Sequence, residues 1–225
     1  MIVTFDLFSA LTDSRRGGTA AFAELARERN WELGGEQLYD EWDRHNKEAQ
    51  RVVDTGTGWT SFKEISRGAL AAAYAALEVA GDPEADIDRL QGSVADWPLW
   101  PDVAEGLKAV AGPVRIGILS NVDDALAVTT RAYPLVDPDL VLSSQRLGAY
   151  KPDPAIYLRA RDLLGDDFVH VAASARDVRG ALEAGIPTIR IARPGHRVDP
   201  DGPQPDVSID AVPQLIAALS EIAAR

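Results

Sequence analysis

The chain has 225 residues, 46% of them hydrophobic and 26% charged, which is enough apolar sequence for one domain with a large insertion or for two modest domains. Its net charge of -12 and its pI of about 4.7 argue against nucleic acid and anionic membrane as partners, because both would repel the surface, but they allow a small anionic substrate. Cysteine is absent, so disulfides, thiolate zinc sites and thiol catalysis are excluded. No apolar run reaches the roughly 18 residues that a membrane-spanning helix needs, and we expect a cytoplasmic protein.

The first part of the chain is predicted to be one strand followed by a helical block. Residues 2–6 form an apolar strand that ends at Asp6, and the residues from there to about Gly18 are predicted to be a loop. Apolar residues at helical spacing then predict four helices, at residues 20–31, 35–53, 59–80 and 85–94. The glycine-rich segments 34–35 and 54–58 and the segment 81–83 separate these helices.

The rest of the chain alternates between strands and helices. Strands are predicted at residues 114–119, 140–142, 168–172, 186–192 and 206–209. Helices are predicted at residues 103–111, 123–133, 154–164, 177–184 and 212–224. This alternation is typical of the α/β class with a doubly wound parallel sheet, and the helical block is then an insertion over the carboxyl edge of that sheet.

Four polar residues lie at, or just after, the predicted carboxyl ends of strands: Asp6, Ser120, Lys151 and Asp177. In a parallel sheet these ends converge on one crevice, which favours a catalytic site. Each residue also has an ordinary structural explanation. Asp6 could cap a turn, Ser120 or Asp177 could belong to the start of a helix, and Lys151 could be solvated. The convergence of all four is the stronger evidence.

Other side chains are candidates for holding an anionic substrate. Asn121 follows Ser120 at the start of a helix, where backbone N–H groups attract anions. An arginine of the helical block could hold a carboxylate through two hydrogen bonds; Arg44 is our candidate, with Arg15 and Arg16 as competitors and a solvated helix face as the alternative. The three histidines are scattered, without metal-ligand spacing, and His170 in a buried strand is expected to be structural.

The order of these residues resembles the four-motif signature of the haloacid dehalogenase superfamily over essentially the whole chain. The residues that carry the resemblance are Asp6, Ser120-Asn121, Lys151-Pro152-Asp153-Pro154 and Asp177. The resemblance implies a Rossmann-like core formed by residues 1–13 and 95–225, with a helical cap domain formed by residues 14–94.

Further details look most like the 2-haloacid dehalogenase branch. Phe8 stands where the phosphatase branch has a second aspartate, and the segment 171–177 lacks the Gly-Asp pair that holds magnesium in phosphatases. The resemblance implies that Asp6 displaces halide and forms an ester, and that Asp177 helps water to hydrolyse it while Lys151 and Ser120 hold charges in place. We expect the substrate-binding residues to be Phe8, Asn121, Tyr157, Arg44 and Ser174. The resemblance implies an arginine of the cap in this role but gives no clean match for it, so Arg44 is included on its position in the helical block alone.

One departure concerns the nucleophile loop, where Ala10 replaces the family's threonine, so we expect an orienting hydroxyl to be missing there.

The first hypothesis from the resemblance is a hydrolase that acts on a 2-haloacid or similar small carboxylate and needs no cofactor or metal. The alternatives are a degenerate relative that binds a small anion or a protein, and a phosphatase that needs magnesium. The resemblance also suggests a homodimer.

Overall fold

The computed structural model describes residues 1–53 and 59–224, and within them six parallel strands form one sheet in the order β3-β2-β1-β4-β5-β6. The strands are β1 (Ile2–Phe5), β2 (Arg115–Ser120), β3 (Val141–Ser143), β4 (Phe168–Ala172), β5 (Thr188–Ile191) and β6 (Val207–Ile209). The chain enters the sheet at β1 in the middle, and the later strands are added on either side of it. The predicted doubly wound α/β fold is confirmed.

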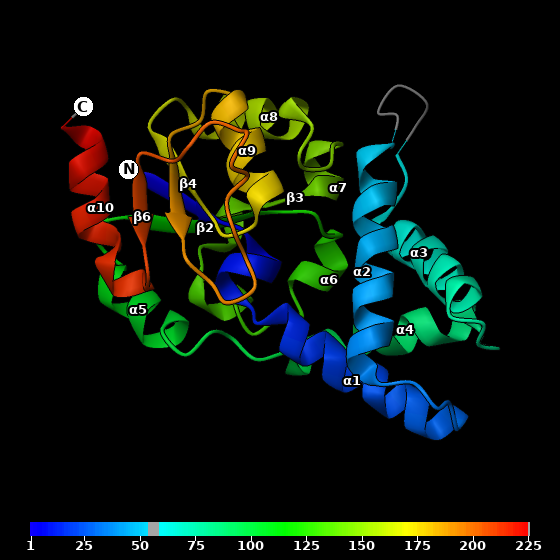
Figure 1. The fold of residues 1–225 in the computed structure, drawn as a ribbon. Coiled ribbons are helices and arrows are strands. Elements are labelled where there is room, and N and C mark those ends of the chain that lie inside the picture. Colours follow the sequence, from blue (N-terminus) through cyan, green and yellow to red (C-terminus); the bar gives the residue numbers. More distant parts are fainter. Residues whose placement is uncertain (54–58, 225) are drawn as a thin grey trace.

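Helices cover both faces of this sheet (Figure 1). The longer helices of this part are α5 (Val103–Val110), α8 (Pro154–Leu164), α9 (Ala175–Glu183) and α10 (Leu215–Ala223). The short helices and turns are η1 (Leu7–Leu11), α6 (Asp124–Ala127), η3 (Tyr133–Leu135), η4 (Pro138–Leu140), α7 (Ser144–Leu147) and η5 (Val212–Gln214). Apolar side chains of α5 and α10 share one core cluster with Val3 and Phe5, and those of α8 and α9 share another with Leu119 and Phe168.

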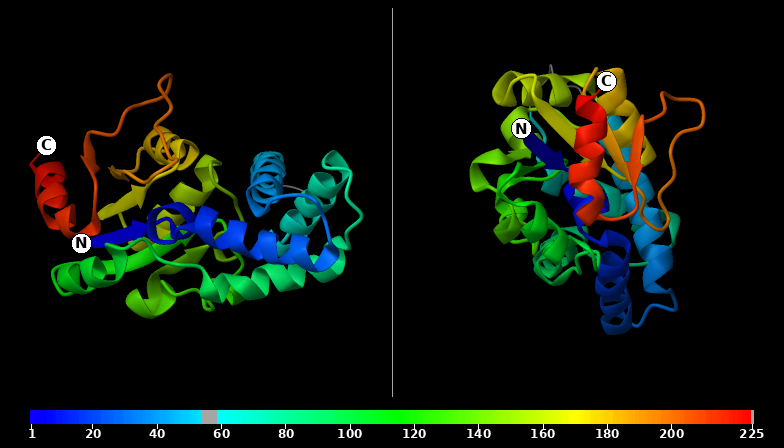
Figure 2. Two further views of the ribbon diagram at one scale, coloured as in Figure 1. Left: turned by 60° about the horizontal axis from the view of Figure 1, so that its bottom comes forward. Right: turned by 90° about the vertical axis from the view of Figure 1, so that its left-hand side faces the viewer.

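A second group of helices lies beyond the carboxyl ends of the strands (Figures 1 and 2). It consists of α1 (Ser14–Arg29), α2 (Gly35–Arg51), α3 (Phe62–Ala76), α4 (Pro83–Ser93) and the turn η2 (Val94–Asp96). We call α1–α4 the helical unit. It has an apolar cluster of its own, which includes Phe22, Leu38 and Leu70. None of the helices in the described ranges is long and apolar enough to cross a membrane.

The predicted loop between Asp6 and Gly18 is wrong, because this segment is largely helical. Asp6 caps the turn η1 by accepting a hydrogen bond from the backbone N–H of Ser9, and Asp13 caps α1 by accepting one from Arg16. Helix α1 therefore begins at the capping position, well before the first apolar residues that predicted it. The short connection between β1 and α1 holds the helical unit close to Asp6.

The helix predicted at residues 123–133 is shorter than expected and ends at Ala127. The hydroxyls of Thr129 and Thr130 donate to the carbonyl oxygens of Leu126 and Ala127, both at 2.8 Å, and so compete with continued helical bonding. The other predicted helices and strands are present, with ends that differ by a few residues. The predicted break at residues 54–58 lies outside the described residues.

Replacing Gly35 by Ala should lower the free energy of unfolding by about 1–3 kcal/mol. An added Cβ would lie 2.6 Å from the backbone nitrogen of Ala23, so α2 could not approach α1 as it does. Urea unfolding measures the difference. Gly34→Ala is the matched control, because no atom lies within 4 Å of its added Cβ, and its effect should stay within about 0.5 kcal/mol. Equal effects of the two substitutions would contradict this account of the packing.

Candidate active site

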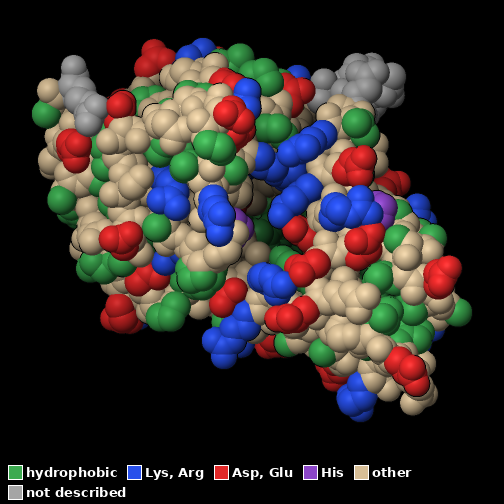
Figure 3. Space-filling view, in the orientation of Figure 1, with side chains coloured by type: hydrophobic (Ala, Val, Ile, Leu, Met, Phe, Trp, Pro, Cys, Tyr) green, Lys and Arg blue, Asp and Glu red, His purple; other side chains and the backbone are tan. Residues whose placement is uncertain are grey.

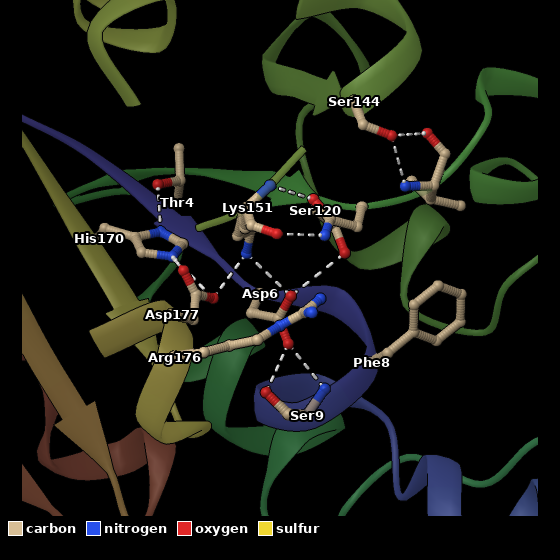
Figure 4. A network of polar contacts seen from close by, with 12 residues as sticks. Thr4, Asp6, Phe8, Ser9, Ser120, Ser144, Lys151, His170, Arg176 and Asp177 are labelled. Atoms are coloured by element: carbon tan, nitrogen blue, oxygen red, sulfur yellow. Dashed lines mark hydrogen bonds and ion pairs between the residues drawn. The ribbon is translucent and has the colours of Figure 1, made fainter. Parts of the chain in front are cut away.

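Asp6 lies where β1 ends, and both oxygens of its carboxylate are held (Figure 4). Oδ2 accepts hydrogen bonds from the backbone N–H of Ser9 at 2.8 Å and from the Ser9 hydroxyl at 2.5 Å. Oδ1 accepts from Lys151 Nζ at 2.9 Å and from the Ser120 hydroxyl at 3.2 Å. The two explanations of Asp6 are therefore compatible, since it caps η1 and also faces the cavity with a fixed carboxylate.

Lys151 joins Asp6 to a second carboxylate. Its ammonium is 2.9 Å from Asp6 Oδ1 and 2.6 Å from Asp177 Oδ2, and the residue is only 2% exposed. The side-chain amide of Asn121 fixes the backbone of Lys151, with Oδ1 accepting from its N–H at 2.7 Å and Nδ2 donating to its carbonyl at 3.0 Å. The loop after β2, through Asn121, thus fixes the loop that carries Lys151, and places its ammonium between two carboxylates.

Asp177 is oriented from behind by two buried residues. Its Oδ1 accepts a hydrogen bond from the Tyr157 hydroxyl at 2.8 Å and lies 3.2 Å from His170 Nε2. His170 Nδ1 is in turn 3.0 Å from the Thr4 hydroxyl. When that hydroxyl donates to Nδ1, Nε2 carries the proton that faces Asp177. His170 therefore has the structural role that its place in a buried strand predicted.

Both carboxylates of this group are held in their charged form. Burial alone raises the pKa of Asp6 and of Asp177, but the Lys151 ammonium and the hydrogen bonds to their oxygens outweigh it. The pKa of each carboxyl therefore lies below its usual value. Asp6 is a permanent carboxylate at neutral pH, as a nucleophile has to be.

A cavity of about 990 Å³ opens above Asp6 between the sheet and the helical unit. Figure 3 shows this hollow, with Lys and Arg side chains gathered around its mouth. One part of its wall is aromatic, because Phe8 packs against Phe62 and Trp97 with ring centroids about 6 Å apart. The predicted site residues that line the cavity are Asp6, Phe8, Ser120, Asn121, Lys151, Ser174 and Asp177.

A family model described as haloacid dehalogenase-like hydrolase matches residues 1–185. The chain belongs to this family. It is 32% identical over 142 residues to an (S)-2-haloacid dehalogenase of Burkholderia cepacia. That match covers 60% of this chain and 58% of the relative. The chain is 34% identical over 90 residues to a glyceraldehyde 3-phosphate phosphatase of Methanopyrus kandleri, over 37% of this chain and 39% of the relative. The matched segments thus span less than two thirds of either relative.

Solved structures of family members resemble almost the whole chain. One L-2-haloacid dehalogenase has a TM-score of 0.81 and 29% identity over 97% of this chain and 98% of its own. Another, from Xanthobacter autotrophicus with chloropropionic acid covalently bound, has a TM-score of 0.82 and 24% identity over 98% of this chain and 99% of its own. At 24% identity, the similarity to the Xanthobacter autotrophicus structure shows a shared fold alone.

Two of the predicted substrate-binding residues, Tyr157 and Arg44, do not line the cavity. Tyr157 is fully buried between α8 and the sheet, and its hydroxyl faces Asp177 from the core side. Arg44 lies on the outer face of α2, where its side chain is 54% exposed and pairs with Glu41 and Glu48. The residues of α2 that line the cavity recur at helical spacing, and Arg44 is not on that stripe. They are Glu36, Tyr39, Asp40, Trp42, Asp43, Asn46, Lys47 and Gln50.

Sequence reasoning missed three residues that the fold brings to the site. Ser9 supplies the hydroxyl that Ala10 was expected to leave missing, and the capping role of Asp6 would have pointed to it. Arg176, next to Asp177, lines the cavity although nothing in its sequence context marked it. His196 also lines the cavity, from the long loop between β5 and β6, and no local pattern could have placed it there.

The residues present do not fit a magnesium ion, which the phosphatase hypothesis requires. Magnesium needs several oxygen ligands, whereas the four oxygens of Asp6 and Asp177 are already committed to Lys151 and its neighbours. Phe8 adds no oxygen from its side chain. No group of three or more acidic or histidine side chains in the described ranges could hold a metal ion.

Replacing Lys151 by Met should make stability fall with rising pH above about pH 4, where these carboxyls give the wild type no pH dependence. In the wild type both folded pKa values lie below the usual 3.8, so their stabilising contribution is complete above that pH and is lost as the pH falls through them. Without the ammonium, burial and mutual repulsion raise the pKa of one carboxyl, so stability should instead fall as the pH rises from about 4 to about 7.

Urea unfolding across this pH range measures the effect of Lys151→Met, and at about pH 7 the variant should lose about 3–5 kcal/mol. Lys108→Met is the control, because that lysine is exposed and pairs with Glu105 far from the cavity. Parallel profiles for Lys151→Met and the wild type would show that the ammonium does not set these pKa values.

Proposed function

We propose that this family member is a metal-independent hydrolase that uses Asp6 as a covalent nucleophile on a 2-haloacid or a related small carboxylate. The observation that carries the proposal is a fixed, ionised Asp6 with the aromatic side chain of Phe8, and no acid, two residues further on. A leaving alkoxide needs a proton donor, whereas halide leaves as a stable anion. The site therefore suits a carbon–halogen bond better than a phosphate ester.

In the first step the Asp6 carboxylate attacks the carbon that bears the halogen. A carbon–oxygen bond forms, the carbon–halogen bond breaks, and the halide leaves with the electron pair. Ser9 and Lys151 fix the direction of the carboxylate before the substrate arrives, so little orientation has to be gained during the reaction. The product of this step is an ester of Asp6 with the 2-hydroxyacyl group.

In the second step water attacks the carbonyl carbon of the Asp6 ester and Asp177 takes its proton. Esterified Asp6 carries no charge, so Lys151 first pairs with Asp177 alone and lowers its basicity. As water adds, negative charge develops on Asp6 and draws the ammonium back, which frees Asp177 to accept the proton. When this intermediate collapses, the bond from the Asp6 carbonyl carbon to the 2-oxygen of the acyl group breaks and Asp177 returns its proton to that oxygen. The 2-hydroxyacid leaves, and Asp6 and Asp177 are both carboxylates again.

The surroundings of Asp6 support a substrate with one polar and one apolar side. The aromatic wall at Phe8 and Phe62 offers a surface for the 2-substituent, and a cavity of about 990 Å³ has room for more than a three-carbon acid. We also propose that residues 14–94 form a cap domain that shields this cavity, and that residues 1–13 and 95–225 form the core. A cytoplasmic location and a homodimer stay predictions.

Asp6→Asn should abolish halide release from 2-haloacids, by at least about 10³-fold in kcat/KM, because the amide is a poor nucleophile. Halide is measured with chelator present, on a series from 2-chloropropanoate to 2-chloro-3-phenylpropanoate. In water enriched in ¹⁸O, a single turnover with enzyme in excess should give unlabelled hydroxyacid, because its new oxygen comes from Asp6.

Asp139→Asn, at a turn in the core remote from the cavity, is the matched control and should keep full activity. Labelled product in the first turnover would replace the covalent mechanism with direct attack by water. No halide from any acid of the series would remove the dehalogenase proposal. Hydrolysis of a phosphate ester that depends on added magnesium would then favour the phosphatase.

Ser9→Ala should lower kcat for halide release about 10-fold with little change in KM, because a hydroxyl hydrogen bond to a charged group is lost while the Ser9 N–H remains. Steady-state kinetics of the variant measure both constants. Ser220→Ala, in α10 and remote from the cavity, is the control. An unchanged kcat would show that the backbone N–H alone orients Asp6.

A further inference from the structure

Arg176 approaches Asp6 from the core side of the cavity. It lies in the first turn of α9, immediately before Asp177, and its side chain extends toward Asp6 in Figure 4. It lines the same cavity as Asp6, Lys151 and Phe8. A ligand at the nucleophile would therefore meet this guanidinium.

The guanidinium of Arg176 is held by neutral acceptors only. It donates to the side-chain oxygen of Gln50 and, at 3.4 Å, to the backbone carbonyl of Lys47. Within the described ranges, no carboxylate lies within ion-pairing distance of it. The Arg176 side chain is half-buried, and burial lowers its pKa although the charges of Asp177 and Asp6 act in the opposite direction. The carboxylates of Asp6 and Asp177 attract this charge without pairing directly with it, so the guanidinium keeps N–H groups that can donate to an anionic ligand.

The charges around Asp6 make such a cation necessary for an anionic substrate. Asp6 and Asp177 carry two negative charges and Lys151 only one positive charge, so the three together would repel a carboxylate. Lys151 has little to offer the substrate, because it is buried and its ammonium already bonds to both carboxylates. Arg176 brings the net charge of the group to zero before the substrate binds.

The other cations that line the cavity are less suited to this role. Arg15 pairs with Glu36 and Asp40, and Lys47 pairs with Asp43. Arg16 is exposed to solvent on α1. Arg176 therefore differs from all three by combining partial burial with neutral partners.

We propose that Arg176, from the core and not from the helical unit, binds the carboxylate of the substrate while Asp6 attacks its 2-carbon. This deepens the proposed function and rests on it for the identity of the reacting carbon. Gln50 holds one side of the guanidinium, so that the remaining N–H groups can donate to both oxygens of a carboxylate. The 2-substituent of the substrate is then directed toward the aromatic wall at Phe8.

The test compares the binding of propanoate with that of propanamide. The two molecules have a similar shape, but only propanoate is charged. Neither carries a halogen, so neither can react. Isothermal titration calorimetry should show that the wild type prefers propanoate. Arg176→Gln should weaken propanoate binding about 10- to 100-fold and leave propanamide binding unchanged. Arg176→Lys should lie between them, because it keeps the charge and loses the planar fork.

Arg179→Gln is the matched control. Arg179 lies one turn further along α9, is 43% exposed, and pairs with Glu183 and Asp199. The Arg179→Gln variant should bind both propanoate and propanamide as the wild type does. Circular dichroism and thermal unfolding establish that each variant is folded, and if Arg176→Gln does not fold, Arg176→Lys decides the question through its loss of preference for propanoate.

The outcomes separate this inference from the proposed function. Equal binding of propanoate by the wild type and by folded Arg176 variants, or no preference for propanoate in the wild type, would overturn the role of Arg176 even if halide is released from 2-haloacids. Loss of the preference in the Arg176 variants would support that role even if no 2-haloacid is turned over, which would leave a carboxylate-binding site with a different reaction.

Discussion

The structure of the site depends on one buried interaction, the ammonium of Lys151 between the carboxylates of Asp6 and Asp177. Two buried carboxylates this close together could not both stay ionised without it, and a buried ammonium would be equally unfavourable without them. The triad keeps Asp6 charged and links the ends of strands that are far apart in the sequence. The clamp of Asn121 on the Lys151 backbone and the support of Asp177 by Tyr157 maintain its geometry.

The site is formed by two parts of the chain, the parallel sheet with its loops and the helical unit. The parallel sheet fixes the reacting groups, because strand ends buried on both faces allow little movement. The helical unit supplies most of the remaining cavity wall, and at the site it contacts the core both through the aromatic pair Phe8 and Phe62 and through hydrogen bonds. Gln50 of α2 accepts hydrogen bonds from both Asn121 and Arg176, and so joins the helical unit to the loops at the carboxyl ends of the strands. A substrate that enters this cavity contacts both parts.

Family membership narrows the chemistry without fixing the substrate. The relatives include a protein named as a dehalogenase and one named as a phosphatase, so the choice between carbon–halogen and phosphate ester cleavage has to come from the site. The side chain at Phe8, the committed oxygens of both carboxylates and the neutral partners of Arg176 all favour a small organic acid. These are properties of this chain's own residues.

The sequence by itself determined the alternation of strands and helices, the helical insertion after β1, and the meeting of Asp6, Ser120, Lys151 and Asp177 at one edge of the sheet. It could do so because apolar periodicity sets the elements, and strand ends in a parallel sheet converge. Only the tertiary structure decided which of Arg44 and Arg176 lines the cavity with Asp6, since the rotation of α2 and the packing of α9 are set by contacts across that cavity. Arg44 is exposed and pairs with Glu41, whereas Arg176 is half-buried at the cavity and donates to neutral acceptors.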